Sequence, residues 1–175
     1  MRDDVAGAMP VKLVVCGGYG SGKTTFVGAI SEIVPITTEA PLTEMSLGVD
    51  DGTGTTKTAT TVALDFGRIS LDSGLVLYLF GLSGQPRFRF SWAEVTKGAI
   101  GAVVLVDSRR LDGFASVDFC EARSIPFVVA VNRFDGSLSH TLDAVREALV
   151  LDARSRADAK GTLISLTLHA LSTAI

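Results

Sequence analysis

The chain has 175 residues, a length at which one compact domain is the usual outcome. A hydrophobic fraction of 47% is sufficient for a buried core and excludes a disordered chain. The net charge of -3 excludes the basic surface that would bind a nucleic acid, and two cysteines are too few to hold this fold by disulfides. We therefore expect an α/β protein with two reduced thiols and no nucleic-acid partner.

The amino-terminal segment Met1–Met9 is polar and lacks the basic start and apolar stretch of a secretory signal. We expect a flexible segment over residues 1–9, followed by one nucleotide-binding domain over residues 10–175. The longest apolar runs, Leu75–Phe80 and Ala99–Val106, fall short of the ~20 residues that a membrane-spanning helix needs. These features predict a cytoplasmic protein that does not insert into a membrane directly, although partners could recruit it there.

The apolar run Val11–Cys16 predicts a buried strand, and apolar residues at helical spacing over Thr24–Val34 predict a helix that Pro35 stops. Between them, Gly17–Thr24 matches the pattern G-x-x-x-x-G-K-[ST] in the strand-to-helix context that this pattern requires. Its glycines let backbone N–H groups surround phosphate oxygens, its lysine reaches the outer phosphates, and its hydroxyl binds magnesium. We predict phosphate contacts from Gly17, Gly20, Ser21, Gly22, Lys23, Thr24 and Thr25.

The region from Pro35 to Thr60 is rich in glycine and threonine and shows little periodicity, which indicates a long functional loop. After it, the apolar runs Val62–Leu71 and Leu75–Phe80 flank a turn signal, Asp72-Ser73-Gly74. These two runs therefore predict an antiparallel hairpin.

The remaining chain alternates apolar runs with stretches of helical character. We expect strands at Ile100–Asp107, Pro126–Asn132 and the very short Val150–Leu151, and helices at 112–123, 141–149 and 157–171. A strand, a helix and a strand in succession favour a parallel sheet. The predicted fold is α/β of the P-loop NTPase type, a mostly parallel central sheet with one antiparallel edge strand from the hairpin and helices on both faces.

A possible base-reading motif follows the predicted strand that ends at Asn132. Asn132-Arg133-Phe134-Asp135 resembles the guanine-specificity motif N-K-x-D of the Ras-like GTPases, with arginine in the place of lysine. The resemblance implies that Asp135 accepts hydrogen bonds from guanine and that Asn132 ties neighbouring loops together. Asp152-Ala153-Arg154 is similar to the S-A-K element of that family, which implies a contact between the Ala153 amide and the guanine carbonyl oxygen.

The segment Thr61–Phe66 resembles the start of the second strand in Ras-like proteins, whose threonine senses the terminal phosphate through magnesium. Thr61 is the residue that this resemblance implies, and the adjacent Thr60 is the alternative. Together with Thr24, Thr61 would be a magnesium ligand.

The segment Gly81–Gln85 is similar to the D-x-x-G-Q motif of the same proteins. The resemblance implies that Gly84 donates its amide to the terminal phosphate, that Gln85 orients the attacking water, and that Lys23 stabilises the transferring phosphoryl group. Gly81 stands where the motif has aspartate, so the hold on magnesium must come from elsewhere, either from Asp107 or from water alone. We expect weak magnesium coupling and slow hydrolysis.

A closer resemblance is to the actinobacterial conservon GTPases, relatives of the MglA-type bacterial small GTPases. It covers about Val11 to Leu171 and includes the atypical glycine at position 81, and it is carried by motifs such as Asp65–Ile69, Leu79–Gly81, Gly84-Gln85, Val106–Leu111, Pro126–Asn132 and Asp152–Arg156. That family implies a cytosolic GTP/GDP switch with a roadblock-type regulatory protein and a sensor-kinase-like protein as partners.

Three functions remain open from the sequence. The leading one is a GTPase switch with GTP/GDP and magnesium as cofactors, in which Arg87, Arg89, Arg109 or Arg110 acts in cis or is only a solvated surface residue. The second is a nucleotide-stabilised interaction protein with negligible turnover, which Gly81 favours. The third is an ATP-dependent kinase, for which the sequence shows no obvious lid or acceptor site.

Overall fold

The computed structural model describes residues 8–41, 61–71, 74–107, 109–110, 113–134, 149–151 and 153–173, without the side chains of 38–41, 61–63, 149–151 and 167–173. The strands are β1 (Met9–Gly17), β2 (Ile36–Pro41), β3 (Thr61–Leu71), β4 (Leu75–Leu82), β5 (Ala99–Asp107), β6 (Phe127–Asn132) and β7 (Leu149–Leu151). The helices are α1 (Lys23–Ile30), the 3-10 helix η2 (Pro86–Ser91), α2 (Trp92–Val95), α3 (Phe114–Ala122) and α4 (Arg156–Thr173).

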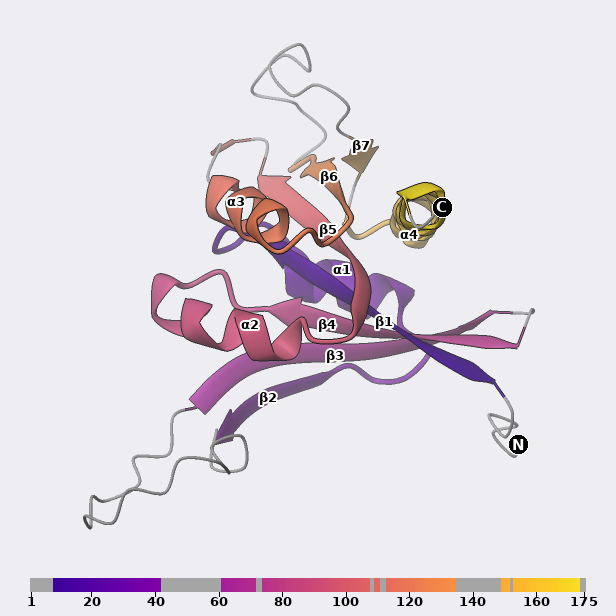
Figure 1. Ribbon diagram of the computed structural model, residues 1–175, viewed down its shortest axis with the longest axis horizontal. Coiled ribbons are helices and arrows are strands. Elements are labelled where there is room, and N and C mark those ends of the chain that lie inside the picture. Colours follow the sequence, from indigo (N-terminus) through magenta and orange to yellow (C-terminus); the bar gives the residue numbers. More distant parts are fainter. Residues whose placement is uncertain are drawn as a thin grey trace.

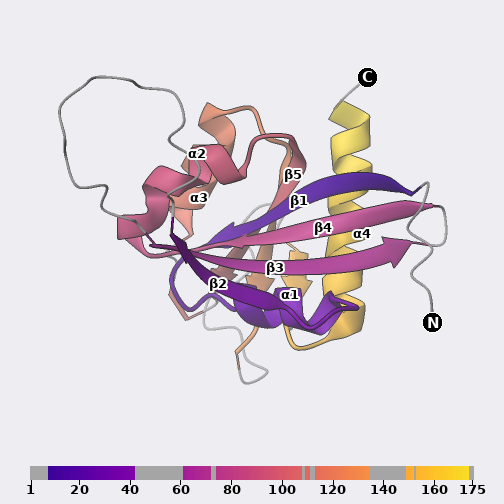
Figure 2. The ribbon, with the colours of Figure 1, turned by 90° about the horizontal axis from the view of Figure 1, so that it is seen from below.

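The strands form one sheet in the order β2-β3-β4-β1-β5-β6-β7. Of these seven strands, β3 is the one that runs against its neighbours β2 and β4, and the other pairs are parallel. Figure 2 shows β2, β3, β4 and β1 side by side in this order. The mostly parallel α/β fold is confirmed, with β2 lying outside the antiparallel strand as the edge of the sheet.

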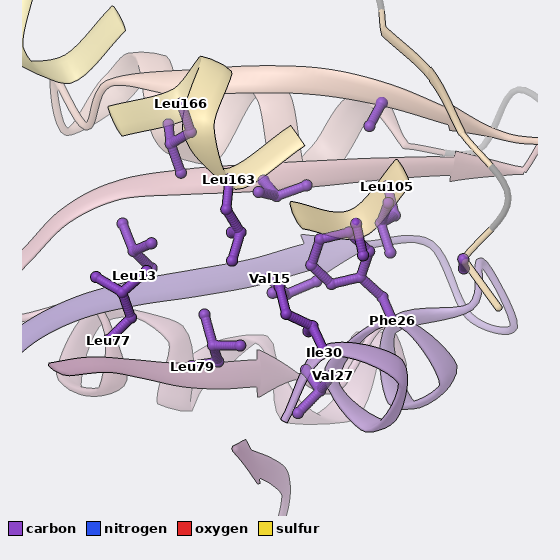
Figure 3. Close-up of a cluster of buried hydrophobic side chains, with 14 of the residues drawn as sticks. Leu13, Val15, Phe26, Val27, Ile30, Leu77, Leu79, Leu105, Leu163 and Leu166 are labelled. Atoms are coloured by element: carbon purple, nitrogen blue, oxygen red, sulfur yellow. The ribbon is translucent and has the colours of Figure 1, made fainter. Parts of the chain in front are cut away.

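The core is divided by the sheet into two layers of buried side chains. Strand β1 contributes to both, because alternate residues of a strand point to opposite faces. Leu13 and Val15 pack on the face covered by α1 and α4, where Figure 3 shows Phe26, Val27 and Ile30 of α1 with Leu163 and Leu166 of α4. Val14 and Cys16 pack on the other face, where α2 and α3 lie together in Figure 1. Cys16 and Cys120 are free thiols in this second layer.

The elements with strong sequence patterns occur close to where they were expected. The hairpin of β3 and β4 is confirmed, with Leu71 paired to Leu75 across the turn. Strand β1 starts at Met9, two residues before the expected strand. The helix expected to reach Val34 ends at Ile30, and Ser31 already has an extended backbone. The Ser31 hydroxyl forms hydrogen bonds with backbone groups of Ile33 and Arg68, which hold the chain in this non-helical course.

Three elements were not predicted. Strand β2 forms inside the expected long loop, where it pairs antiparallel with β3. Between β4 and β5, η2 and the single turn α2 are fixed by Trp92, whose Nε1 donates to the Ser83 carbonyl oxygen at 3.0 Å. The very short strand expected at Val150–Leu151 occurs as β7, which pairs with β6. The helix expected at 141–149 lies almost entirely outside the described residues.

Candidate functional site

The loop between β1 and α1 has the backbone that its glycines allow. Gly17, Gly20 and Gly22 have φ angles of 143°, 74° and 99°, a region that residues with a side chain rarely adopt. A Cβ at Gly17 would also collide with the Leu105 carbonyl oxygen, and one at Gly22 would lie 2.5 Å from Asn132 Nδ2. The loop therefore requires glycine at these positions, and α1 begins directly after it with its N-terminus facing the loop.

Lys23 points back into this loop rather than to solvent. Its side-chain amine donates to the carbonyl oxygens of Gly17 and Gly18 at 3.2 and 2.6 Å, and to Ser21 Oγ at 3.4 Å. The residue is only 8% exposed. A buried ammonium surrounded by neutral oxygens is well placed to bind an anion, since charged acceptors form stronger hydrogen bonds.

The hydroxyl of Thr24 meets a carboxylate that the sequence interpretation missed. Thr24 Oγ1 donates to Asp65 Oδ2 at 2.7 Å, and Thr37 Oγ1 donates to Asp65 Oδ1 at 3.0 Å. Asp65 lies on β3 directly opposite Gly81 on β4, and a Cβ at Gly81 would lie 3.1 Å from Asp65 Oδ2. A carboxylate from the neighbouring strand β3 therefore lies beside position 81.

The hairpin held a signal for this pairing. If Asp72-Ser73-Gly74 is a tight turn, residues equally distant from Ser73 are paired, and Asp65 and Gly81 are both eight residues from it. From the sequence, Asp107 or water alone was expected to hold magnesium in place of an aspartate at position 81. Asp107 instead accepts hydrogen bonds from Arg109, so its two oxygens are used on another side of the site.

Asp107 lies at the end of β5 and is completely buried. It accepts hydrogen bonds from the backbone N–H, Nε and Nη2 of Arg109 at 2.9, 3.0 and 2.8 Å. Burial raises the pKa of Asp107, but the hydrogen bonds from Arg109 and the charges of Arg109 and Arg110 outweigh it and hold the pKa below its usual value. Asp107 is therefore an ionised anchor for these arginines.

Asn132 joins two loops at the end of β6. Its Nδ2 donates to the Ser21 carbonyl oxygen at 3.1 Å, and its Oδ1 accepts the Ala153 N–H at 3.0 Å. Asn132 is 3% exposed, so both contacts are shielded from water. In this structure the Ala153 amide, which the resemblance assigned to the base, is thus used by Asn132. Asp135 lies outside the described residues.

The loop after β4 lies against the phosphate-binding loop. A Cβ at Gly84 would lie 2.6 Å from backbone atoms of both Gly17 and Gly18, so this close approach requires glycine. Gln85 precedes η2 and lines the cavity described below. The backbone of Thr61 opens β3, but its side chain and all of Thr60 lie outside the described residues.

These elements surround a cavity of about 400 Å³, lined by Tyr19, Gly20, Gly22, Lys23, Thr24, Thr25, Thr37, Leu64, Asp65, Gly81, Leu82, Ser83, Gly84, Gln85 and Phe134. A smaller pocket of about 120 Å³ is lined by Gly22, Thr25, Asn132, Arg133, Phe134, Ala153 and Arg154. Gly22, Thr25 and Phe134 line both, so the two are adjacent. Both open at the carboxyl ends of the parallel strands, where open α/β sheets bind ligands.

The described residues contain neither a membrane-spanning helix nor a cluster of metal-binding side chains. No helix there is long and apolar enough to cross a membrane. Within the same residues, no three histidine, cysteine, aspartate or glutamate side chains are grouped as a metal site. Among the described residues that line the cavity, Thr24 and Asp65 bring a hydroxyl and a carboxylate together.

Solved structures similar to this chain include a G domain and an elongation factor. One is the G domain of the T. maritima FeoB iron transporter, at 14% identity and a TM-score of 0.62, covering 95% of this chain and 100% of that one. The other is the bacterial selenocysteine-specific elongation factor EF-Sec, at 14% identity and a TM-score of 0.60, covering 90% of this chain. The present chain spans only 28% of the EF-Sec chain. At this identity the likeness shows a shared fold, that of the P-loop G domains.

No curated protein matches the sequence. A protein family does match, over residues 15–171, which include the glycine loop, the hairpin and the loop after β6. Since this match spans most of the chain, the protein belongs to the family described as conserved hypothetical ATP binding proteins.

Proposed function

We propose that the chain is a guanine-nucleotide switch that binds GTP and GDP with magnesium in a single domain over residues 10–175. The observation that carries this proposal is the position of Asn132, which links the phosphate-binding loop at Ser21 to the segment at Ala153. Through these two contacts, the strand that leads into the candidate base reader is joined to the loop that binds phosphate. A nucleotide would place its phosphates in the larger cavity and its base in the smaller pocket.

Guanine is favoured over adenine by the residues after β6, although the family description mentions ATP. Asp135 follows Phe134, which lines both pockets, and a carboxylate there can accept from the two donors on one edge of guanine. Adenine presents no such pair of donors. Arg133 is exposed and lines the smaller pocket. There it would lie next to the base, in the place of the lysine of the N-K-x-D motif.

Thr24 and Asp65 fit a magnesium ion bound together with phosphates. Magnesium is usually held by one or two carboxylates and substrate phosphates while it keeps several waters. The Thr24 hydroxyl and the Asp65 carboxylate are 2.7 Å apart at the end of the phosphate-binding loop, and Thr61 begins the same strand as Asp65. When bound, magnesium would neutralise phosphate charge. Asp65 would orient the Thr24 hydroxyl and the waters around the ion, the task left open by Gly81.

Titration of the purified chain with GDP, GTP and ATP, each with and without magnesium, tests this proposal. We expect both guanine nucleotides to bind more tightly than ATP, and magnesium to raise the affinity for GTP by about tenfold or more. In Asp65→Asn most of that magnesium effect should be lost, because a neutral amide no longer accepts charge-assisted hydrogen bonds. Asp118→Asn on the exposed side of α3 is the control. Equal magnesium effects in both variants would exclude Asp65, and a preference for ATP would refute the guanine assignment.

Hydrolysis is the finer part of the proposal. Gln85 lines the cavity beside Gly84, where it would orient a water for attack on the terminal phosphate. Turnover without a partner should be slow, on the order of 10⁻⁴ to 10⁻³ s⁻¹. The alternative is an interaction protein that the nucleotide stabilises without turnover.

Single-turnover hydrolysis of GTP by the wild-type chain and Gln85→Leu separates these alternatives. Leucine is similar in size to glutamine but cannot orient water. We therefore expect Gln85→Leu to hydrolyse GTP at least tenfold more slowly than wild type, on the order of the contribution of one positioned catalytic group. The same pair should be measured with the roadblock-type protein that the family resemblance implies, since a partner that supplies an arginine can raise the rate by ~10³ or more. Equal rates for wild type and Gln85→Leu in both settings would favour the interaction protein.

The family resemblance also implies a sensor-kinase-like partner and a cytoplasmic location, with recruitment to the membrane through partners. We include these as parts of the proposal. Co-purification of the GTP-loaded and GDP-loaded chain with each partner would test them, and a switch should bind one loaded form more strongly than the other.

A further inference from the structure

The turn after β5 brings two arginines to one buried carboxylate. Arg109 binds both oxygens of Asp107, and Arg110 Nε lies 3.5 Å from Asp107 Oδ2. The Arg110 N–H also donates to the Asp107 carbonyl oxygen at 3.1 Å, which closes the turn. Both arginine side chains are half exposed, and each guanidinium also reaches a second group.

Arg110 reaches the phosphate-binding loop. Its Nη2 donates to the carbonyl oxygen of Tyr19, and a Cβ at Gly20 would lie 3.3 Å from the same nitrogen. The guanidinium therefore packs directly on the outside of the loop. Arg110 thus binds one backbone carbonyl of the loop, while the N–H groups of such a loop are the groups that bind phosphate.

Arg109 reaches the segment after β6. Its guanidinium carbon lies 3.8 Å from the ring centroid of Phe134, a cation–π contact. Phe134 lines both the larger cavity and the smaller pocket, and it directly precedes Asp135. The contact thus restrains the backbone that carries the candidate base reader.

We propose that Asp107, Arg109 and Arg110 form an arginine clamp that positions the two halves of the nucleotide site, Arg110 the phosphate half and Arg109 the base half. The inference rests on the proposed function, because it assigns these halves to phosphate and base. The arginines are positioning residues here. This role differs from the sequence alternatives for them, a cis catalytic arginine or a solvated surface residue.

The clamp has two arms: Arg110 is the phosphate arm, and Arg109 is the base arm. The rate at which fluorescently labelled GDP is released tests the phosphate arm. Arg110→Ala should release GDP about tenfold faster than wild type, because the Tyr19 carbonyl oxygen loses a charge-assisted donor that holds the loop. Arg110→Lys should release GDP at a rate between those of Arg110→Ala and wild type. An ammonium can donate to the Tyr19 carbonyl oxygen but cannot also reach Asp107. Arg123→Ala is the control, because it removes an arginine that contacts Phe119 at the end of α3 and does not line either pocket. Equal release rates for Arg110→Ala and Arg123→Ala would overturn the phosphate arm.

The ratio of GDP to ADP affinity measures the base arm and separates positioning from general loss of structure. Arg110→Ala should lower the affinities for GDP and ADP by the same factor, whereas Arg109→Ala should lower the affinity for GDP more than that for ADP. Asp107→Asn should show both changes, and the two arginine variants keep the test valid if it fails to fold. An unchanged ratio in Arg109→Ala would overturn the base arm. A wild-type preference for ADP would refute the guanine assignment alone, with the Arg110 arm still measured on ADP, and binding of neither nucleotide would overturn both proposals.

Discussion

Replacement of Lys23 by alanine should lower the affinity of the chain for GDP and GTP by at least about 100-fold. The Lys23 amine is buried at the centre of the phosphate-binding loop, where it donates to three neutral oxygens of Gly17, Gly18 and Ser21. Phosphate oxygens are charged, so the amine would exchange some of these bonds for stronger ones when a nucleotide binds. Two charge-assisted hydrogen bonds account for an effect of this size.

Isothermal titration of wild type and Lys23→Ala with GDP measures this effect. Lys12→Ala is a matched control, because Lys12 lies on the same strand β1 but its amine donates to the Lys97 carbonyl oxygen, away from the loop. Thermal unfolding without nucleotide should be recorded for all three, so that a loss of binding can be separated from a loss of fold. An affinity of Lys23→Ala within a few-fold of Lys12→Ala would contradict the assignment of this cavity to phosphates.

Asp135→Asn should change which base the protein prefers. An aspartate accepts hydrogen bonds from both donors of guanine, whereas an asparagine offers one acceptor and one donor group. We therefore expect the affinity for GDP to fall by about 1,000-fold and the affinity for xanthosine diphosphate, which has an oxygen in place of the amino group, to rise. Sites built on paired hydrogen bonds reject ligands without the partner groups by ~10⁴-fold or more.

Competition of GDP, ADP and xanthosine diphosphate against a labelled nucleotide gives these affinities for wild type and variant. Asp118→Asn removes an exposed carboxylate from α3 and serves as the control. Asp135→Asn with an unchanged order of the three nucleotides would show that the base is read elsewhere. In that case the ATP-dependent kinase would become the better interpretation.

Local patterns were sufficient for the parts of the fold that local chemistry determines. The loop between β1 and α1 needs glycine at positions 17 and 22, and Gly74 has a φ of 73°. The positions of these glycines in the sequence therefore indicated both the loop and the turn. The parallel strands β5 and β6 are largely apolar, and their carboxyl-terminal parts are buried, which made them recognisable. These features placed the loop and the hairpin close to where the structure has them.

The features that sequence missed depend on contacts between distant residues. Helix α1 ends early because Ser31 contacts the backbone of Arg68 on β3. Strand β2 has one partner and a threonine-rich sequence ending in Pro41, so it carries no apolar pattern. The sequence indicated Asp65 only as part of a strand, because its contact with Thr24 depends on its position opposite Gly81 across the hairpin.

The position of Asp65 separates two tasks that a D-x-x-G-Q motif combines in one segment. Here the carboxylate beside Thr24 belongs to β3, which is held between β2 and β4, whereas Gly84 and Gln85 belong to the connection between β4 and η2. The connection can therefore change its conformation around a terminal phosphate without displacing the carboxylate. For the switch proposed above, substitution of Asp65 would act mainly on the metal, whereas substitution of Gly84 or Gln85 would act mainly on the response to the third phosphate.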